Sequence, residues 1–362
     1  MYGCRLGLPN LAPPGRWFTF DAKDTKDTMA RIRHSLIAAV AAAGLLLTAC
    51  SDGGTSTADQ SNATPASEST ITVEDNFGTQ EIALPVEKIA STDNRTFEVL
   101  NAWGIELVAA PKQLVPFTVP EYKDNTDIQD LGTHREPNLE MLTAAEPDLI
   151  INGQRFTQHR DAIVKLNPDT ALIELEPRDG EPVEAELKRQ VTELGKVFEK
   201  ENEADKIIAD FDAALERAKA AYNKDENVMA VNVTGGTIGY IAPSVGRTYG
   251  PVFDMIGLTP ALEVPEGSNN HMGDDISVEA IAAANPDWLL VLDRDAGTTD
   301  RDSADYRPAA AIVEESDALQ NVTAVKEGQI SYAPEDTYTN ESIITYTEIL
   351  NDLADAFEKA QN

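Results

Sequence analysis

The chain has 362 residues, with 42% hydrophobic and 6% aromatic content and a formal net charge of -33. The length exceeds one ordinary hydrophobic core and favours two domains, and the composition is that of a globular protein. The strong acidity argues against nucleic acid or an anionic lipid surface as a partner.

The first predicted feature is a targeting segment. From Met29 the sequence reads MARIRHSLIAAVAAAGLLLTAC, in which arginines precede an apolar run and small residues precede Cys50. This pattern predicts a secretory signal peptide. A transmembrane anchor is the alternative, but the apolar run is only about a dozen residues long. LTAC resembles the lipobox of bacterial lipoproteins, which implies that Cys50 is lipidated and anchors the chain to the extracytoplasmic face of the cell membrane. Residues 1–49 are then an upstream extension plus the signal peptide.

A tether and a hairpin follow. Residues 50–70 are rich in Ser, Thr, Ala and Gly, which predicts a flexible tether. Residues 70–85 alternate between apolar and polar positions around DNFG, which predicts a β-hairpin. Beyond the signal peptide, Cys50 is the only cysteine, so neither a disulfide nor a thiolate metal site is expected.

The remainder of the chain predicts α/β architecture. Apolar runs recur with helical stretches between them, which is typical of parallel strands with crossover helices. We predict an N-terminal α/β lobe at 71–183, a connecting helical segment at 184–222 and a C-terminal α/β lobe at 223–362. The connecting segment keeps helical spacing without a proline, and Gly195 or the polar EKEN that follows is the expected break between two helices.

One segment occurs once in each lobe. PNLEMLTAAEPDLIINGQR (137–155) and ISVEAIAAANPDWLLVLDR (276–294) align without a gap, so that Glu140 matches Glu279 and Arg155 matches Arg294. Each copy predicts a short helix, a Pro-Asp turn and a buried strand. Each arginine falls where a parallel strand leaves the core at its carboxyl end, which is the edge where open α/β sheets bind ligands. The alternative is a reused packing unit without shared function.

A looser pair adds two more arginines. RTFEVLNAWG (95–104) and RTYGPVFDMIG (247–257) place Arg95 and Arg247 ahead of a helix that ends at glycine. Arginines presented by both lobes predict a cleft that receives a compact anion, because charged hydrogen bonds contribute about 1.5 to 3 kcal/mol each.

Histidines and tyrosines supply further candidates. Beyond the signal peptide the histidines are His134, His159 and His271, and their scatter argues against a bare zinc or manganese ion as the cargo. His271, in the polar loop GSNNHMGDD, and Tyr338, after the last strand, are the donor types that suit Fe(III). A solvated histidine and a packing tyrosine are the alternatives.

The segments GTHREPNLE, EPDLIINGQRF and NPDWLLVLDR resemble the substrate-binding lipoproteins of bacterial ABC importers for ferric siderophores. The resemblance covers nearly all of residues 70–360, and DNRTFEVLNAWGIELVAAPKQLVP is most similar to the catecholate subgroup, of petrobactin or enterobactin type. It implies two Rossmann-like α/β lobes joined by a long rigid α-helix, with the ligand cleft between them.

The same resemblance implies roles for particular residues. Arg155, Arg247 and Arg294 would hold the anionic ferric complex, and His271 and Tyr338 would be candidate direct iron ligands. In this chain the histidine stands in HMG and the tyrosine in PEDTY, whereas the family more often places the histidine directly before a glycine and an aromatic run near the tyrosine.

The two matched glutamates, Glu140 and Glu279, would dock to the importer permease. Each also stands at the start of a predicted helix, where a negative charge is favoured by the helix dipole.

The expected function is therefore that of a monomeric, non-enzymatic receptor without a permanently bound cofactor. Its transported ligand would be a ferric siderophore of the catecholate or catecholate-citrate type. Haem, cobalamin and hydroxamate siderophores remain alternative ligands. A surface enzyme would need a catalytic motif, but neither G-x-S-x-G, H-E-x-x-H nor a P-loop occurs. An adhesive surface protein would bind no small chelate.

Overall fold

The structure is a computed structural model, and it describes residues 69–264 and 266–361. These residues belong to one compact unit, Pro65–Asn362. The predicted signal peptide, Cys50 and nearly all of the predicted tether lie outside the described residues. Strand β1 begins at Ser69, within the last two residues that the tether was predicted to include. Within the described residues, none of the helices combines the length and the apolar character needed to span a membrane.

The hairpin predicted at 70–85 is confirmed. Strands β1 (Ser69–Asp75) and β2 (Gly78–Leu84) pair antiparallel around the turn at 76–77. The Asp75 carboxylate accepts the backbone N–H of Phe77 at 2.7 Å, which closes this turn. The hairpin packs on β7 and on helix α5, so it covers one end of the first sheet.

The first sheet is parallel throughout, as the alternating pattern predicted. Its strand order is β5-β4-β3-β6-β7. The strands are β3 (Ile89–Ser91), β4 (Leu107–Ala110), β5 (Gln129–Asp130), β6 (Leu149–Asn152) and β7 (Ala171–Glu174), and the helices between them are α1 (Phe97–Ala102), α2 (Pro120–Lys123), α3 (Leu139–Ala144) and α4 (Arg160–Leu166). We call residues 69–182 the N-lobe.

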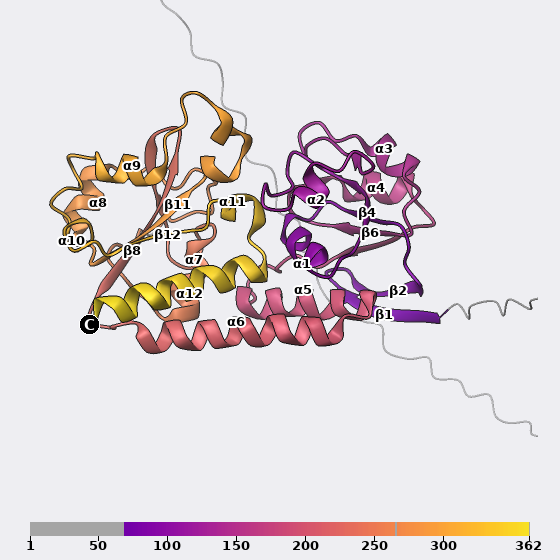
Figure 1. Cartoon of the computed structure of the whole chain (residues 1–362), viewed down its shortest axis with the longest axis horizontal. Coiled ribbons are helices and arrows are strands. Elements are labelled where there is room, and N and C mark those ends of the chain that lie inside the picture. Colours follow the sequence, from indigo (N-terminus) through magenta and orange to yellow (C-terminus); the bar gives the residue numbers. More distant parts are fainter. Residues whose placement is uncertain (1–68, 265, 362) are drawn as a thin grey trace, which may run out of the picture. The chain divides into compact units, whose positions relative to one another are not determined.

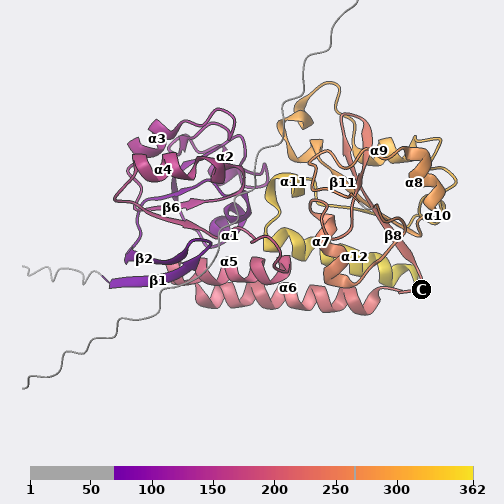
Figure 2. The same cartoon turned by 180° about the vertical axis from the view of Figure 1, so that it is seen from behind.

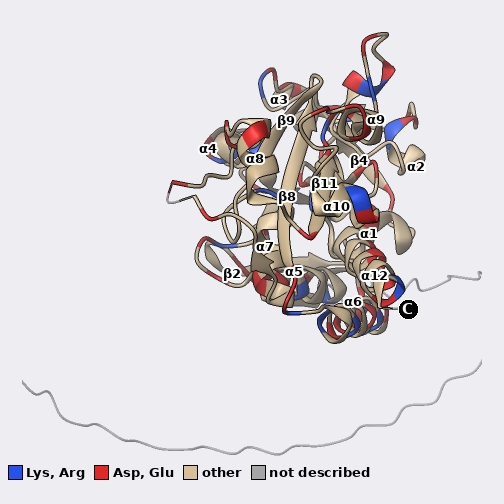
Figure 3. Cartoon of the chain, turned by 90° about the vertical axis from the view of Figure 1, so that its left-hand side faces the viewer, with Lys and Arg blue, Asp and Glu red and all other residues tan. Residues whose placement is uncertain are grey.

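The second sheet is mixed. Its order is β10-β8-β11-β12, with β9 antiparallel to β8. The strands are β8 (Asn227–Thr234), β9 (Thr237–Ile241), β10 (Thr259–Pro260), β11 (Trp288–Asp293) and β12 (Ile330–Tyr332), and the helices of this part are α7 (Tyr249–Ile256), α8 (Val278–Ala284), α9 (Ala309–Glu314), α10 (Thr323–Glu327), α11 (Thr337–Asn340) and α12 (Ile343–Ala360). We call residues 222–361 the C-lobe. Seen from the side, its strand β8 carries no charged residue (Figure 3).

Both sheets reverse their winding direction at an internal point. From β3 the first sheet grows through β4 and β5 on one side and through β6 and β7 on the other. The second sheet grows from β8 in the same two-sided way, with β11 as the neighbour across the reversal. Ligands of open α/β sheets bind outside the carboxyl ends of the strands at such points. The residues that follow β3, β6 and β11 are therefore placed for binding.

The duplicated segment has the same structure in both lobes. Each copy forms a short helix, α3 or α8, and a buried strand, β6 or β11. Between them Glu146 and Asn285, at matched positions, both have φ of 47°. The aspartates of the Pro-Asp turns also match: Asp148 accepts the backbone N–H of Lys88 at 2.9 Å, and Asp287 accepts that of Asn227 at 2.8 Å. Each aspartate thus fixes the start of the first strand of its sheet.

The predicted connecting segment forms two helices, α5 (Val183–Phe198) and α6 (Glu201–Ala221). The break falls at Glu199, the first residue of the predicted EKEN break, which has the left-handed φ of 54°, and Gly195 does not interrupt the helix. Gly195 lies inside α5, where an added Cβ would meet the Cβ of Ala204 at 2.9 Å, so its missing side chain lets the two helices approach. Helix α6 has 21 residues and therefore spans roughly 30 Å.

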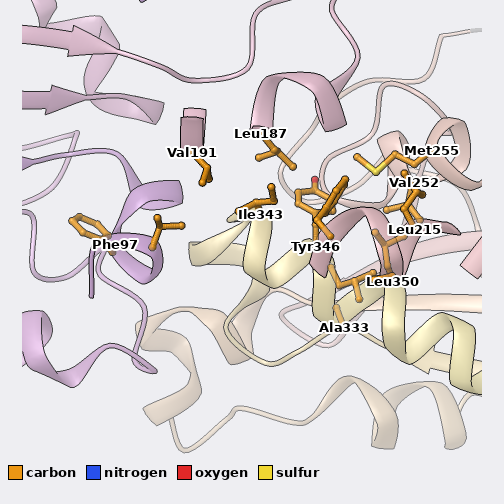
Figure 4. Close-up of a cluster of buried hydrophobic side chains, with 14 of the residues drawn as sticks. Phe97, Leu187, Val191, Leu215, Val252, Met255, Ala333, Ile343, Tyr346 and Leu350 are labelled. Carbon is orange, nitrogen blue, oxygen red and sulfur yellow. The ribbon is translucent and has the colours of Figure 1, made fainter. Parts of the chain in front are cut away.

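Helices α5, α6 and α12 lie along one side of both sheets (Figure 1), and the view from behind shows the same arrangement (Figure 2). They belong to one apolar cluster of buried residues that includes both lobes. Figure 4 shows part of it, from Phe97 of α1 through Leu187 of α5 and Ile343 of α12 to Val252 of α7. The lobes therefore share a packed base beneath the edge where their loops meet.

Candidate ligand-binding site

Loops from both lobes enclose a cavity of about 320 Å³ at the carboxyl edges of the sheets. We call it the arginine cavity, because Arg135, Arg155, Arg247 and Arg294 line it. The other lining residues are Asn94, Gln113, Leu114, Thr133, His134, Gln154, Thr298, Thr299, Asp300, Tyr338 and Thr339. Of the sequence-predicted ligand residues, the structure brings Arg155, Arg247, Arg294 and Tyr338 into this cavity.

A sharp turn after β6 places Arg155. Gly153 is fully extended, and an added Cβ there would meet the carboxyl group of Asp93 at 2.5 Å. Gln154 has a φ of 53°, and its backbone N–H donates to Glu176 at 2.9 Å. The chain thus reverses directly after the strand, and Arg155 points across to the C-lobe.

Backbone strain marks the loop of Arg247. Ser244 and the β-branched Thr248 have φ of 66° and 63°, values that such residues rarely adopt. Between Arg247 and Tyr249 a backbone hydrogen bond of 2.7 Å closes a very tight turn. Strain of this kind costs on the order of 1 to 3 kcal/mol for each residue and is concentrated at functional sites.

The three predicted arginines converge on Tyr338, which is buried in helix α11. The Nη2 of Arg155 donates to the Tyr338 hydroxyl at 2.9 Å. The guanidinium carbons of Arg247 and Arg294 lie 4.3 Å and 4.9 Å from the centre of its ring. Both are cation–π distances. An N-lobe arginine and two C-lobe arginines are thereby held around one aromatic ring.

Two of these arginines are partly neutralised by carboxylates. Arg247 forms a bidentate pair with Glu341, at 3.1 Å from Nε and 2.9 Å from Nη2. Arg294 pairs through Nη1 with Asp295 at 2.9 Å and with Asp300 at 3.3 Å. Its Nε is buried and has no hydrogen-bond partner among the described residues.

Arg135 and Arg155 differ from every other described arginine. Within 69–264 and 266–361, no carboxylate lies within ion-pair distance of either guanidinium, whereas the remaining arginines all form ion pairs there. Both line the arginine cavity from the N-lobe. Positive charge that the protein does not neutralise is therefore concentrated on that wall.

Arg95 lies beside the arginine cavity rather than in it. It lines an adjoining hollow of about 930 Å³, which shares Gln154 and Arg247 with the cavity. Its Nη2 is 3.4 Å from Glu341, so Glu341 joins an arginine of each lobe. Arg95, which was predicted to bind the ligand, thus does not line the arginine cavity, and its guanidinium pairs with Glu341 of the C-lobe.

His271 lies on an exposed loop and does not line the cavity. No hydrogen bond of its imidazole occurs among the described residues, and its backbone oxygen accepts from Asn232 at 3.2 Å. Partial burial and the positive charges of Arg155, Arg294 and Arg247 lower its pKa below the usual value. The arginine charges therefore disfavour the protonated form of this imidazole.

Sequence reasoning missed His134 and Arg135 as site residues. The turn at 133–136 is fastened by backbone bonds between Thr133 and Glu136 and by the His159 ring nitrogen, which lies 2.8 Å from the His134 oxygen. The Nδ1 of His134 is buried without a hydrogen-bond partner among the described residues. Their sequence signal is the polar stretch GTHRE directly before the first duplicated segment, which belongs to the segments that carry the family resemblance.

The glutamates predicted to contact a permease are exposed and stand in the first turns of α3 and α8. Both helices precede a parallel strand, so their amino ends lie at the same sheet edge as the cavity. As for metal sites, the described residues contain no cluster of three or more His, Cys, Asp or Glu side chains that could hold a metal ion.

Comparison with known proteins gives concordant matches. The model of a family described as "Periplasmic binding protein" matches residues 89–337. The ferric-anguibactin-binding protein FatB of Vibrio anguillarum is 27% identical over 295 residues, which cover 80% of this chain and 88% of that protein. The petrobactin-binding protein YclQ of Bacillus subtilis is 26% identical over 321 residues, which cover 87% and 96%.

A solved structure extends the likeness to three dimensions. The siderophore-binding protein BauB, bound to a complex of two acinetobactin molecules and ferric iron, matches with a TM-score of 0.69 and 25% identity. The match covers 80% of this chain and 99% of that chain. The predicted two-lobed α/β fold is confirmed by this likeness and by the family match.

Proposed function

Because the chain belongs to the periplasmic binding protein family, whose members are binding proteins rather than enzymes, we propose that it captures a ferric siderophore outside the cytoplasm and delivers it to an ABC importer. The observation that carries this proposal is the convergence of Arg155, Arg247 and Arg294 on Tyr338 in one cavity. The printed functions of FatB, YclQ and BauB, which bind ferric anguibactin, petrobactin and a ferric acinetobactin complex, support the cargo class.

The cavity suits a compact anion with aromatic groups. Its volume of about 320 Å³ is at the small end of ligand sites. Guanidinium groups donate charged hydrogen bonds to anionic oxygens and also stack on aromatic faces. A ferric catecholate or catecholate-citrate complex presents both features. A neutral hydroxamate complex would leave Arg135 and Arg155 without an anionic partner, and haem would need an apolar slot in place of arginines and threonines.

Tyr338 completes the iron coordination when the siderophore supplies too few donor atoms, and His271 joins it only if its exposed loop, which does not line the cavity, approaches the bound complex. In the structure the Tyr338 hydroxyl accepts a hydrogen bond from Arg155. An Fe(III) ion bound by the Tyr338 oxygen would have to replace this hydrogen bond. Phenolate and catecholate ligands of Fe(III) both give visible charge-transfer absorption, so Tyr338→Phe should change the position or intensity of the visible band of the loaded protein rather than abolish it. A loaded protein whose spectrum is the same in both forms would show that the tyrosine does not coordinate iron.

The arginine assignment is tested by single alanine variants of Arg155, Arg247 and Arg294. Each should weaken binding of a ferric catecholate by about tenfold or more, because each removes a charged hydrogen bond. Isothermal titration calorimetry measures the affinity. Arg307→Ala is the control, since that arginine is exposed, pairs with Glu315 and lies outside the cavity. Unchanged affinity in all three cavity variants would refute the site.

Glu140 and Glu279 contact the permease from the rim of the cleft, one on each lobe. The double variant Glu140→Ala/Glu279→Ala should keep its affinity for the cargo, because neither residue lines the cavity. It should fail to stimulate the ATPase of the importer reconstituted in liposomes. Full stimulation by the double variant would exclude these residues from the contact.

The chain is anchored through a lipid on Cys50, and its folded part works as a monomer. Cys50 lies outside the described residues, so the lipobox pattern alone supports the anchor. Cys50→Ser should abolish incorporation of labelled fatty acid and release the protein from the membrane fraction. Retention of the label in this variant would contradict the assignment, and a dimer in light scattering would contradict the monomer.

A further inference from the structure

Asp300 places a negative charge in the wall of a cavity that arginines otherwise dominate. It is the only carboxylate among the described residues that line the arginine cavity. Its Oδ2 lies 3.3 Å from Nη1 of Arg294, and its side chain is 58% exposed. A carboxylate in this place repels any anion that enters the cavity, so affinity for an anion does not explain its presence.

The position of this carboxylate is held by its own turn. Asp300 belongs to the short 3-10 turn η4 (Thr299–Asp302), and its backbone N–H donates to the Thr298 hydroxyl at 3.2 Å. That hydroxyl in turn lies 3.1 Å from Oδ2 of Asp300. Arg301 ties the turn to Ala296 through a hydrogen bond of 3.0 Å. The carboxylate therefore faces the cavity as a fixed part of the wall.

On the C-lobe side of the cavity, carboxylates offset the positive charge of the arginines. There Glu341 balances Arg247, and Asp295 together with Asp300 balances Arg294. The unneutralised charge comes from Arg135 and Arg155 on the N-lobe wall. Of the three carboxylates, Asp300 is the one that itself lines the cavity.

We propose that Asp300 is a specificity-determining residue that limits the negative charge of the cargo. The proposal rests on the proposed function and refines its ligand class. Repulsion between Asp300 and the ligand grows in proportion to the ligand's charge, so it penalises a highly charged complex more than a weakly charged one. Ferric iron held by three catecholates is more negative than iron held by two. The favoured cargo is therefore a ferric complex with two catecholates or with mixed donors.

The test compares two synthetic chelators, a tetradentate bis-catecholate and a hexadentate tris-catecholate, each loaded with Fe(III). Asp300→Asn keeps the shape of the side chain and its hydrogen-bonding oxygen but removes the charge. This variant should bind the tris-catecholate about tenfold more tightly than the unaltered protein does. Affinity for the bis-catecholate should rise far less, so the ratio of the two affinities shifts toward the tris-catecholate. Calorimetry at low salt and at physiological salt measures both, and screening should shrink the shift at the higher salt.

Asp302→Asn is the matched control, because Asp302 is exposed on the same turn and does not line the cavity. It removes the same charge and should leave the affinity ratio within about twofold of the original. If the affinity ratio of Asp300→Asn equals that of this control, the proposed role of Asp300 is refuted, but the proposed receptor function is not. Failure of the unaltered protein to bind either complex would overturn the proposed function together with this inference.

Discussion

Glu341 joins the two lobes and also holds an arginine of the arginine cavity in place. Its carboxylate is buried between Arg247 and Arg95 and accepts the Thr248 hydroxyl at 2.6 Å. Burial alone would raise the pKa of this carboxyl, but the charges of Arg247 and Arg95 outweigh burial and hold it below the usual value. Glu341 is therefore ionised in the folded protein at neutral pH.

Neutralising this group should be costly. Glu341→Gln leaves two partly buried guanidinium groups without their shared anion, and breaking a fully buried ion pair on one side costs about 3 to 5 kcal/mol, so the loss should approach the lower end of this range. Urea unfolding should show a loss of this order. Glu335→Gln is the control, since Glu335 pairs with Arg301 on the surface with 69% of its side chain exposed. A variant as stable as this control would contradict the structural role of Glu341.

The sign of the pH dependence follows from the lowered pKa. The stability that Glu341 contributes is fully present above the pKa of the unfolded state, near 4.3 for a free glutamate, because the carboxylate is ionised in both states there. It is lost as the pH falls through the lower folded-state pKa. Stability should therefore fall below about pH 4 in the unaltered protein, and this loss should be smaller in Glu341→Gln.

Asp93 should show the opposite dependence. It is buried at the end of β3, where it caps the turn of Arg95, and burial raises its pKa to about 6. Between the unfolded value near 3.9 and this folded value, the folded state holds the extra proton, so its contribution to stability falls as the pH rises. Carbon-detected NMR of the carboxyl group should show a midpoint near 6. A midpoint near 4 would show that the carboxyl group is not desolvated.

At the scale of elements, the two ends of the duplicated segment's strand lie at opposite edges of the sheet, one with the Pro-Asp turn and the other with the cavity arginine. The aspartates of its Pro-Asp turns fix strand starts at the amino edge of each sheet, whereas its arginines lie at the carboxyl edge. The two ends of one strand therefore have separate tasks.

This division is tested by Asp287→Ala. The variant leaves the backbone N–H of Asn227 without its carboxylate partner and should lower the free energy of unfolding by about 1 to 3 kcal/mol. Its affinity for the cargo should remain within about twofold, since Asp287 lies a whole strand away from the cavity. Asp148→Ala tests the other copy. A tenfold loss of affinity without a loss of stability would contradict this separation.

The elements themselves were predictable to a large degree. Periodic or repeated sequence patterns mark the hairpin, the parallel strands and the two copies of the helix–turn–strand segment. Such patterns involve residues that are close together in the sequence, so the sequence alone reveals them. The ion pairs between arginines and carboxylates were not predictable, because partners such as Arg247 and Glu341 are separated by 94 positions in the sequence. The same holds for Gly195, which permits helix packing against Ala204 although it was expected as a candidate break.

On the scale of the whole molecule, the site is assembled from residues of both lobes by a shared base. Asn94 donates to the Thr339 oxygen at 2.8 Å, and Thr118 donates to Asp336 at 2.5 Å, so N-lobe side chains hold the loop that carries Tyr338. These hydrogen bonds between the lobes favour a largely preformed cleft over a wide closing movement of the lobes. The family resemblance predicts a rigid connection between the lobes, and helix α6 together with the shared apolar core is consistent with that prediction.

The apolar cluster beneath both lobes also decides how the protein melts. Because buried residues from α1 to α12 belong to one continuous cluster, neither sheet can lose its base while the other keeps it. Heating should therefore give one transition, with a calorimetric enthalpy equal to the van't Hoff enthalpy. Two resolved transitions in scanning calorimetry would show that the lobes are separate cooperative units. With a single transition, a chain cut within α6 should yield no independently stable half, so neither lobe should be obtainable alone as a folded fragment.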